Sequence, residues 1–346
     1  MRRYGVLLAG TLSLLASPLL LAQEEYVAPL DIAYRKADIN SEGTRMSAEV
    51  FAPKDTTHKL PTIIMSHGWG GTAEHLRPDA VAFARAEFLV ITFDYRGWGD
   101  SDARVIAKSR PVQQNGKRIA EVSEVRGVVD PIDQTTDILN VLHWVQDEER
   151  CDPNRIGIWG SSFSGGHVVY VAARDLRVKA FVSQVGSMDG RWVMQNPDLR
   201  KLTFSQGTQR TRGQIGYPEP FAKFGGMTGQ PVWEKLMQYA PIEDIGRCEE
   251  CAKLFIIAEN EELFDNKDHA IAAFERAKGV KKLVTIKGIT HYDVYTEKRK
   301  DAQQLAINWF REHLNAPPVR KKPSPKNLEQ HMSISNRHSP EGTKSR

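Results

Sequence analysis

A serine set among small residues, directly after an apolar run, is the feature of this sequence best suited to nucleophilic chemistry. Residues 156–166 read IGIWGSSFSGG, so an apolar segment passes into a tight turn and then into a segment of helical character. A nucleophile elbow needs this order, because its turn leaves no room for bulky neighbours and pushes the central side chain out above the sheet. Taking Gly160 and Ser164 as the small flanking residues makes Ser162 the predicted nucleophile.

Two other interpretations of the same turn stay open. A register centred on Ser164, with Ser162 and Gly166 as its small neighbours, also fits the pattern. An ordinary strand-to-helix turn capped by a serine has the same local composition. Ser162 is preferred because it lies three residues after Trp159, the last apolar residue of the run, with Gly160 between them.

A glycine-rich loop after an earlier apolar run supplies a second part of the same chemistry. The run at residues 61–66 continues into the sequence HGWGG, which begins at His67. In enzymes with a nucleophile elbow, the loop after this strand and the residue after the nucleophile each give one backbone N–H to the oxyanion hole. The predicted donors are Trp69 and Phe163, which would stabilise the negative oxygen of the tetrahedral intermediate. His67 lies upstream of the serine and is interpreted as structural.

The general base and its carboxylate partner are expected in the chain order serine, acid, histidine. His291 follows the apolar run at residues 282–286 after a short loop and is the predicted base. The loop at residues 259–265 reads ENEELFD, and a carboxylate there would accept a hydrogen bond from the imidazole and fix its tautomer. Glu261 is the predicted acid and Asp265 the alternative. The other acids of this loop are interpreted as solvated charges.

Two further polar features are assigned structural roles. His269 falls within a segment of helical spacing and is interpreted as a satisfied surface histidine. Residues 94–102 read DYRGWGDSD, in which the glycines suit a tight turn and the charges are expected to tie neighbouring loops together. Neither feature is expected to take part in catalysis.

Apolar runs and helix-like segments alternate along the chain. Short apolar runs suited to buried strands lie at residues 61–66, 88–93, 155–159, 178–185, 253–258 and 282–286. Segments with helical spacing lie at residues 73–86, 134–146, 165–173, 267–277 and 299–313. This order predicts an α/β fold with a mostly parallel sheet and helices on both faces. The alternating residues 44–51 predict one earlier antiparallel strand.

Two long stretches interrupt this alternation. Residues 104–130 form an excursion before the second main helix, and residues 188–247 separate two strands by far more than a usual connection. The second stretch is rich in aromatic residues: Trp192, Phe204, Tyr217, Phe221, Phe224, Trp233 and Tyr239. We interpret residues 188–247 as a cap or lid over a site, with a peripheral packing insertion as the alternative.

The two ends of the chain are predicted to differ from its folded part. Arg2 and Arg3 precede an uncharged stretch rich in Leu and Ala, so residues 1–22 are a predicted signal peptide, with an uncleaved membrane anchor as the alternative. We therefore expect a periplasmic or secreted protein that has no membrane contact after cleavage. Residues 315–346 are polar, basic and rich in proline, and are predicted to be a disordered tail.

The charge balance argues against one class of partner. The formal net charge of the chain is +4, but residues 23–314 alone carry about −3. A nucleic-acid-binding domain carries its basic excess on the folded part, so no nucleic-acid partner is expected.

The three cysteines do not indicate a metal site. Cys248 and Cys251 form a C-x-x-C pair without a second pair, whereas a structural zinc site usually needs four ligands. We interpret them as a local disulfide or as two idle thiols, and Cys151 has no partner in the sequence. Neither a metal nor a cofactor is expected.

Seven phrases of the sequence together resemble the dienelactone-hydrolase and Xaa-Pro-dipeptidyl-peptidase-like group of the α/β-hydrolase superfamily. The phrases run from about residue 60 to residue 314 and read HGWGG, DYRGWGDSD, VRGVVDP, RIGIWGSSFSGGHV, DLRVKAFVSQV, IAENE and GITHYDVY. The resemblance implies an α/β-hydrolase domain over residues 23–314. In that group the acid is commonly an Asp in the phrase A-x-N-D. Glu261 stands at that position here, and its extra methylene changes its reach to His291.

These features predict hydrolysis of a small-molecule ester or amide through an acyl-enzyme on Ser162. An acyltransferase or an Xaa-Pro peptidase would use the same three residues, and a non-catalytic binding protein on the same scaffold is a further alternative. The aromatic insertion suggests a substrate with an apolar or aromatic acyl or alcohol part. The sequence does not predict the oligomeric state.

Overall fold

The computed structural model describes residues 26–314. The predicted signal peptide at residues 1–22 and the predicted tail at residues 315–346 lie outside the described residues. Within residues 26–314, none of the helices combines the length and the apolar character needed to cross a membrane.

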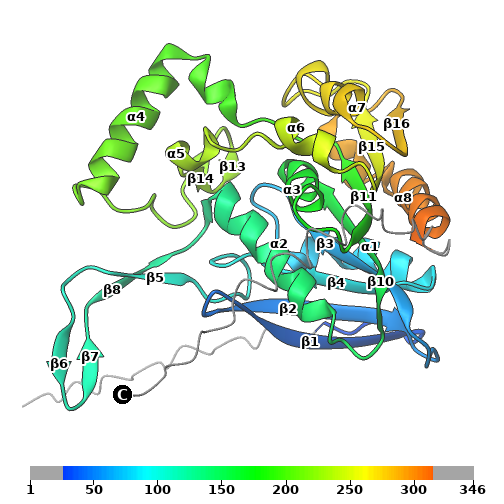
Figure 1. Cartoon of the computed structure of the whole chain (residues 1–346), viewed down its shortest axis with the longest axis horizontal. Coiled ribbons are helices and arrows are strands. Elements are labelled where there is room, and N and C mark those ends of the chain that lie inside the picture. Colours follow the sequence, from blue (N-terminus) through cyan, green and yellow to red (C-terminus); the bar gives the residue numbers. More distant parts are fainter. Residues whose placement is uncertain (1–25, 315–346) are drawn as a thin grey trace, which may run out of the picture.

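The core of the described chain is an eight-stranded, mostly parallel sheet (Figure 1). Its strand order is β1-β2-β4-β3-β10-β11-β15-β16. The strands are β1 (Ile32–Ser41), β2 (Thr44–Pro53), β3 (Leu60–Ser66), β4 (Leu89–Phe93), β10 (Cys151–Ser161), β11 (Val178–Gln184), β15 (Ala252–Ala258) and β16 (Lys281–Ile286). Within this eight-stranded sheet, only the β1–β2 and β2–β4 pairs are antiparallel. The predicted α/β fold with a mostly parallel sheet is confirmed.

The apolar runs mark the central strands well, because parallel strands that are covered on both faces need apolar side chains in both directions. Every residue of β3, β4 and β15 is buried. β1, which was not predicted from the sequence, pairs with β2 over its whole length. β1 lies at the edge of the sheet and carries charged residues among its apolar ones, so it shows no apolar run.

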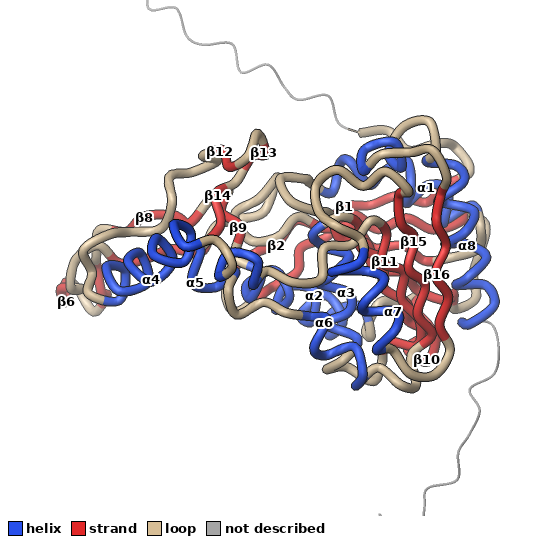
Figure 2. Tube along the Cα trace, turned by 90° about the horizontal axis from the view of Figure 1, so that it is seen from above, coloured by secondary structure: helices blue, strands red, loops and turns tan. Residues whose placement is uncertain are grey.

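Helices cover both faces of the sheet, as Figure 2 shows from above. The helices α1 (Ala73–Arg85) and α8 (Arg299–Leu314) pack on one face. The helices α2 (Pro131–Val145), α3 (Phe163–Ala172) and α7 (Ala272–Arg276) pack on the other. The segment predicted as one helix at residues 267–277 is instead a π-helical turn, Lys267–Ile271, followed by the short α7.

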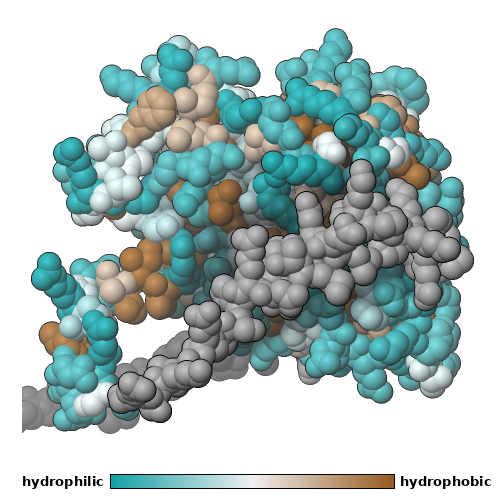
Figure 3. All heavy atoms as spheres, in the orientation of Figure 1, coloured by the Kyte–Doolittle hydropathy of each residue, from teal (hydrophilic) through white to brown (hydrophobic). Residues whose placement is uncertain are grey.

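The first long stretch, residues 104–130, contains an arm of two antiparallel strand pairs that projects from the body (Figure 1). Its strands are β5 (Arg104–Ala107), β6 (Val112–Gln114), β7 (Lys117–Ile119) and β8 (Val122–Val125), paired as β5–β8 and β6–β7. The arm exposes several apolar side chains, and Figure 3 shows hydrophobic surface along it. These side chains are Val105, Val112, Ile119 and Val122.

The segment at residues 188–247 lies beside the carboxyl edge of the sheet and contains α4 (Pro197–Thr211), α5 (Trp233–Leu236) and α6 (Pro241–Asp244). Its short strands are β12 (Lys223–Phe224), β13 (Met227–Thr228) and β14 (Gln230–Pro231). β14 pairs with β9 (Val128–Val129), which directly precedes α2. This pairing fastens the segment, called the cap below, to the body of the protein.

Candidate active site

Ser162 lies at a sharp turn between β10 and α3. β10 ends at Ser161 and α3 begins at Phe163, so that a single residue connects the strand and the helix. Ser162 has φ 57° and ψ −126°, a conformation that a residue with a side chain adopts only when the surrounding structure enforces it. Its N–H donates to the Gln184 carbonyl oxygen at 2.9 Å, and its own carbonyl oxygen accepts the N–H of Gly165 at 2.9 Å. This strained turn is the conformation that a nucleophile elbow requires.

Two glycines make the turn possible by leaving room for close approach. A Cβ on Gly160 would lie 2.3 Å from the Ser164 carbonyl oxygen, and one on Gly68 would lie 2.7 Å from the Ser162 Cβ. Gly68 belongs to the HGWGG loop after β3. The loop backbone therefore touches the serine directly.

The side chain of Ser162 is the first member of a hydrogen-bonded chain of three residues. The His291 Nε2 lies 3.0 Å from the Ser162 Oγ. The His291 Nδ1 lies 2.9 Å from both carboxylate oxygens of Glu261. The side chains of His291 and Glu261 are each only 1% exposed, so this pair is shielded from water. The structure thus brings together the three residues that were predicted to be catalytic.

Neighbouring residues fix the position of His291. It begins a short 3-10 turn, His291–Tyr295, in the loop after β16. Thr290 caps this turn by donating its N–H and its hydroxyl to the Asp293 carboxylate at 2.7 and 2.9 Å. The backbone N–H of His291 donates to the Glu262 carboxylate at 2.7 Å.

Glu262 is a site residue that was not predicted from the sequence. It was interpreted as one of several solvated charges in its loop, and it is indeed exposed. One of its carboxylate oxygens nevertheless holds the backbone of His291. The only signal in the sequence was its position next to Glu261, which does not distinguish a bonded carboxylate from a solvated one.

The alternative nucleophile and the alternative acid lie apart from this chain of three. Ser164 is fully buried, and its hydroxyl hydrogen-bonds to the Ser66 hydroxyl and to the Tyr95 hydroxyl. Asp265 accepts the backbone N–H of Lys267 at 2.9 Å and so caps a turn of its own loop.

The two competing histidines are both buried. Burial lowers the pKa of His67 to about 4, and its ring packs edge-on against Tyr95, which fits the structural role predicted for it. His269 was interpreted as a surface residue, and this is wrong. Its Nδ1 accepts the backbone N–H of Met188 at 2.9 Å, at the start of the cap. The helical pattern was misleading because the π-helical turn directs this side chain into the protein.

The predicted oxyanion donors, Trp69 and Phe163, both adjoin Ser162. Phe163 is the first residue of α3, where backbone N–H groups have no acceptor within the helix. Trp69 follows Gly68, the residue in contact with the serine. The rings of Trp69 and Phe163 pack against each other with centroids 5.2 Å apart. The backbone of Phe163 thus directly follows the nucleophile, and the backbone of Trp69 directly follows the glycine that contacts it.

The loop at residues 94–102 follows β4 and is held by buried polar contacts. Asp94 accepts the N–H of Ala73 at 2.7 Å and that of Asp100 at 3.0 Å, and burial raises its pKa to about 6. Arg96 forms a buried ion pair with Asp137 of α2. These contacts tie the loop to α1 and α2, in the structural role that was predicted for it.

The three cysteines are buried free thiols in this structure. Burial raises the pKa of Cys248 to about 12 and raises that of Cys251 as well. A local disulfide and two idle thiols were both left open for Cys248 and Cys251, and the structure has free thiols at both positions. Among residues 26–314, no group of three or more His, Cys, Asp and Glu side chains is placed to hold a metal ion.

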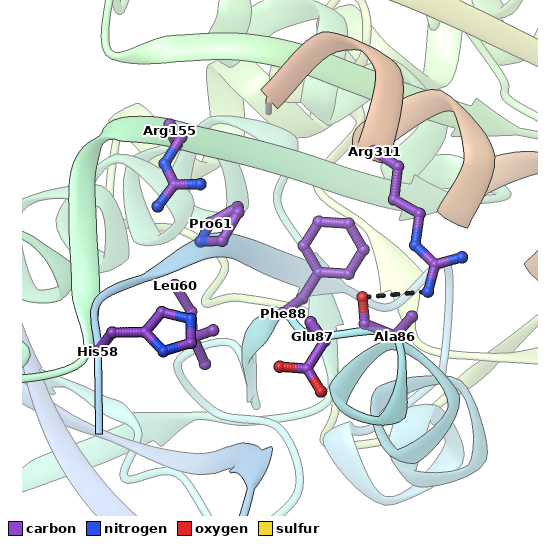
Figure 4. A pocket seen from close by; sticks show the side chains of 8 residues that line it. All are labelled: His58, Leu60, Pro61, Ala86, Glu87, Phe88, Arg155 and Arg311. Atoms are coloured by element: carbon purple, nitrogen blue, oxygen red, sulfur yellow. Dashed lines mark hydrogen bonds between the residues drawn. The ribbon is translucent and has the colours of Figure 1, made fainter. Parts of the chain in front are cut away.

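A surface pocket of the described residues lies away from this site. It has a volume of about 320 Å³, and Figure 4 shows its lining residues: His58, Leu60, Pro61, Ala86, Glu87, Phe88, Arg155 and Arg311. β3 starts at Leu60 in this pocket, whereas Ser162 follows the last residue of β10. Because β3 and β10 are parallel, the pocket lies at the amino-terminal ends of the strands and the serine lies at their carboxyl-terminal ends.

Comparison with known proteins gives matches over most of the described chain. The model of the X-Pro dipeptidyl-peptidase (S15) family matches residues 42–207. An uncharacterized 31.7 kDa protein from the traX-finO intergenic region of Escherichia coli is 31% identical over 312 residues, which cover 79% of this chain and 97% of that protein.

Solved structures show the same fold. A hypothetical protein from Pseudomonas aeruginosa superposes with a TM-score of 0.69 at 19% identity, covering 85% of this chain and 98% of its own. The α/β hydrolase GrgF from a Penicillium species superposes with a TM-score of 0.65 at 17% identity, covering 82% of this chain and 100% of its own. At these identities the likeness concerns the fold, and it confirms the predicted α/β-hydrolase architecture.

Proposed function

We propose that this chain, a member of the α/β-hydrolase superfamily, is a serine hydrolase that cleaves carboxylic esters through an acyl-enzyme on Ser162. It belongs to one family with the uncharacterized E. coli protein, and the S15 family model matches it over residues 42–207. The observation that carries the proposal is the chain of hydrogen bonds from Ser162 through His291 to Glu261. Nucleophilic catalysis needs a serine in contact with a base that a third group orients.

The first step follows from the orientation of His291. Glu261 accepts the Nδ1–H of the imidazole, which leaves the Nε2 free to accept the proton of the Ser162 hydroxyl. The serine oxygen then attacks the ester carbonyl carbon, and the carbonyl oxygen becomes an anion. The Glu261 carboxylate stabilises the positive charge on the imidazolium, so the proton transfer does not create an unpaired buried charge.

The next steps use the same groups. The backbone N–H groups of Trp69 and Phe163 stabilise the anionic oxygen of the tetrahedral intermediate. The His291 imidazolium gives its proton to the leaving alcohol as the carbon–oxygen bond breaks. A water molecule then attacks the acyl-enzyme with His291 as base, and the carboxylic acid is released.

A glutamate can replace the usual aspartate at this site. Both oxygens of Glu261 lie at the same 2.9 Å from the His291 Nδ1, and one of them also accepts the N–H of Leu263 at 3.2 Å. The longer side chain therefore reaches the imidazole and is held by its own loop. The neighbouring Glu262 holds the histidine backbone, so two successive carboxylates position one imidazole.

The test is covalent labelling with a fluorophosphonate probe, followed by turnover of p-nitrophenyl esters and of Pro-containing dipeptide amides. Wild type should label and should hydrolyse the esters, and Ser162→Ala should do neither. Ser164→Ala is the matched control, because it removes the alternative nucleophile from the same turn, and it should still label.

Each contrary outcome has its own meaning. Labelling that persists in Ser162→Ala shows that another residue is the nucleophile. A folded wild type that takes no label and turns over no ester favours a non-catalytic binding protein. Turnover confined to the dipeptide amides replaces the esterase by a peptidase.

A further inference from the structure

Three aromatic rings lead from the predicted oxyanion hole into the cap. The Trp69 ring lies 6.1 Å from the Phe224 ring at an interplanar angle of 31°, and the Phe224 ring lies 6.4 Å from the Trp192 ring at 24°. Phe224 is thus stacked with Trp192 and tilted relative to Trp69, and the three rings form one continuous series. We call Trp69, Phe224 and Trp192 the aromatic ladder.

The ladder begins beside the nucleophile and ends at the protein surface. Trp69 packs against Phe163, the residue after Ser162, and Trp69 and Phe224 are each half-buried. Trp192 is 36% exposed. Partly exposed aromatic rings in a row offer apolar surface that a ligand can cover, and covering such surface favours binding.

The cap holds its part of the ladder in a fixed place. The Trp69 indole Nε1 donates to the Gly229 carbonyl oxygen of the cap at 2.9 Å. Phe224 packs edge-on against the buried Trp233 with centroids 5.0 Å apart. The ladder is therefore built before a substrate arrives, which reduces the entropy cost of binding.

The geometry of the reaction assigns a role to this wall. The leaving alcohol must face His291, because that imidazole protonates it, and the carbonyl oxygen must face the N–H groups of Trp69 and Phe163. The acyl substituent is then directed away from His291 and from both N–H groups, so a wall that begins beside Phe163 and continues into the cap can contact it.

We propose that the aromatic ladder is the acyl-binding wall of this enzyme, and that the preferred substrates are esters of apolar carboxylic acids with an extended or aromatic acyl part, longer than acetyl. This inference rests on the proposed esterase function. Trp192 and Phe224 act as specificity-determining residues, because they contact the part of the acyl group that short acids lack.

The experiment is a series of p-nitrophenyl esters of acetic, butyric, hexanoic and octanoic acids. The leaving group is constant, so only the acyl part varies. For wild type, kcat/KM should rise with chain length by up to about fourfold per methylene while the chain covers the ladder. In Trp192→Ala, kcat/KM for the octanoyl ester should fall by about tenfold or more, whereas that for the acetyl ester should fall less than threefold.

Phe224→Leu is a second variant that keeps an apolar side chain in the half-buried position, and it should also lose more activity on octanoyl than on acetyl ester.

Phe204→Ala is the matched control. Phe204 is an aromatic residue of α4 in the same cap and is 51% exposed, but it lies outside the ladder. Its substitution should leave the whole chain-length profile as in wild type. Thermal unfolding of each variant checks the fold.

The outcomes separate this inference from the proposed function. A folded wild type that takes no label and turns over none of the four esters contradicts the proposed esterase function itself. Turnover with a flat chain-length profile, or a Trp192→Ala variant that loses activity equally on all four esters, overturns the ladder while the esterase stands. A loss in Phe204→Ala that matches the loss in Trp192→Ala also overturns it.

Discussion

The Nε2 of His291 lies 3.0 Å from the Oγ of Ser162, although the two residues are 129 positions apart in the chain. One follows β16 and the other follows β10, and both of these parallel strands end at the same edge of the sheet. The sheet thus brings a base and a hydroxyl together without any local sequence relationship between them.

Glu261→Gln should lower kcat by about 10²- to 10⁴-fold with little change in KM, because an amide can donate to the imidazole and select the wrong tautomer. Asp265→Asn, the matched change in the same loop, should stay within about twofold of wild type, since Asp265 only caps its own turn. Steady-state kinetics on one ester checks both. Equal losses in the two variants would show that the loop as a whole matters and not the Glu261 contact.

Glu262→Gln should reduce kcat by about three- to tenfold, because a neutral amide is a weaker acceptor for the backbone N–H of His291. Glu262 positions the base and does not touch the substrate, so we expect KM to stay constant. Glu259→Gln is the control, since Glu259 binds the exposed Lys287 and the backbone N–H of Gly288 at the same loop. A rise in KM with unchanged kcat in Glu262→Gln would contradict a positioning role.

Gly68→Ala should abolish most activity while the protein stays folded. The new Cβ would lie 2.7 Å from the Ser162 Cβ and 3.3 Å from its Oγ, so the loop must move away from the nucleophile. We expect a loss of about 10²-fold or more in kcat, of the size seen when an oxyanion donor is removed. Gly246→Ala meets no atom within 4 Å and serves as control. Full activity in Gly68→Ala would mean that this loop does not form the oxyanion hole.

His167 should make folding stability depend on pH. It is fully buried between the Tyr239 hydroxyl and the Gln134 side chain, and burial lowers its pKa to about 3. The unfolded chain protonates this histidine below about pH 6.5, whereas the folded protein keeps it neutral, so the stability it contributes is complete above pH 6.5 and is lost as pH falls.

His167→Gln lacks this titration. The difference in the free energy of unfolding between wild type and His167→Gln should therefore be largest above pH 7 and shrink by about 1.4 kcal/mol per pH unit below 6.5. Urea unfolding of both proteins from pH 5 to pH 8 measures the difference. A difference that is constant over this range would contradict the neutral buried histidine.

The cysteines should be unreactive until the protein unfolds. All three thiols are buried, and the raised pKa of Cys248 disfavours the thiolate that reacts. A thiol-disulfide exchange reagent should react slowly with native protein and should find three thiols per chain in denaturant. Finding only one thiol in denaturant would show that the Cys248–Cys251 pair had formed a disulfide.

The residue types and their order along the chain were enough to predict the fold class and most of the site. Ser162, the HGWGG loop and His291 each follow an apolar run, and in a parallel sheet all such loops meet at one edge. Ser162, His291 and this loop could therefore be assigned without coordinates. The edge strand β1 was missed because a strand with one exposed face and many charges shows no apolar run.

Only the tertiary structure distinguishes between chemically similar residues that are close in the sequence. Glu261 and not Asp265 meets His291, because the loop after β15 directs one carboxylate inward and uses the other to cap a turn. The hydroxyl of Ser164 points into the core because α3 begins at Phe163 and turns it toward Tyr95.

The aromatic ladder and the burial of His269 depend in the same way on how the cap packs against the body. Local sequence predicts which loop a side chain belongs to, because backbone preference and apolar pattern are local. The direction of that side chain is decided by contacts between segments that are distant in the chain, and these contacts form only when the whole domain folds.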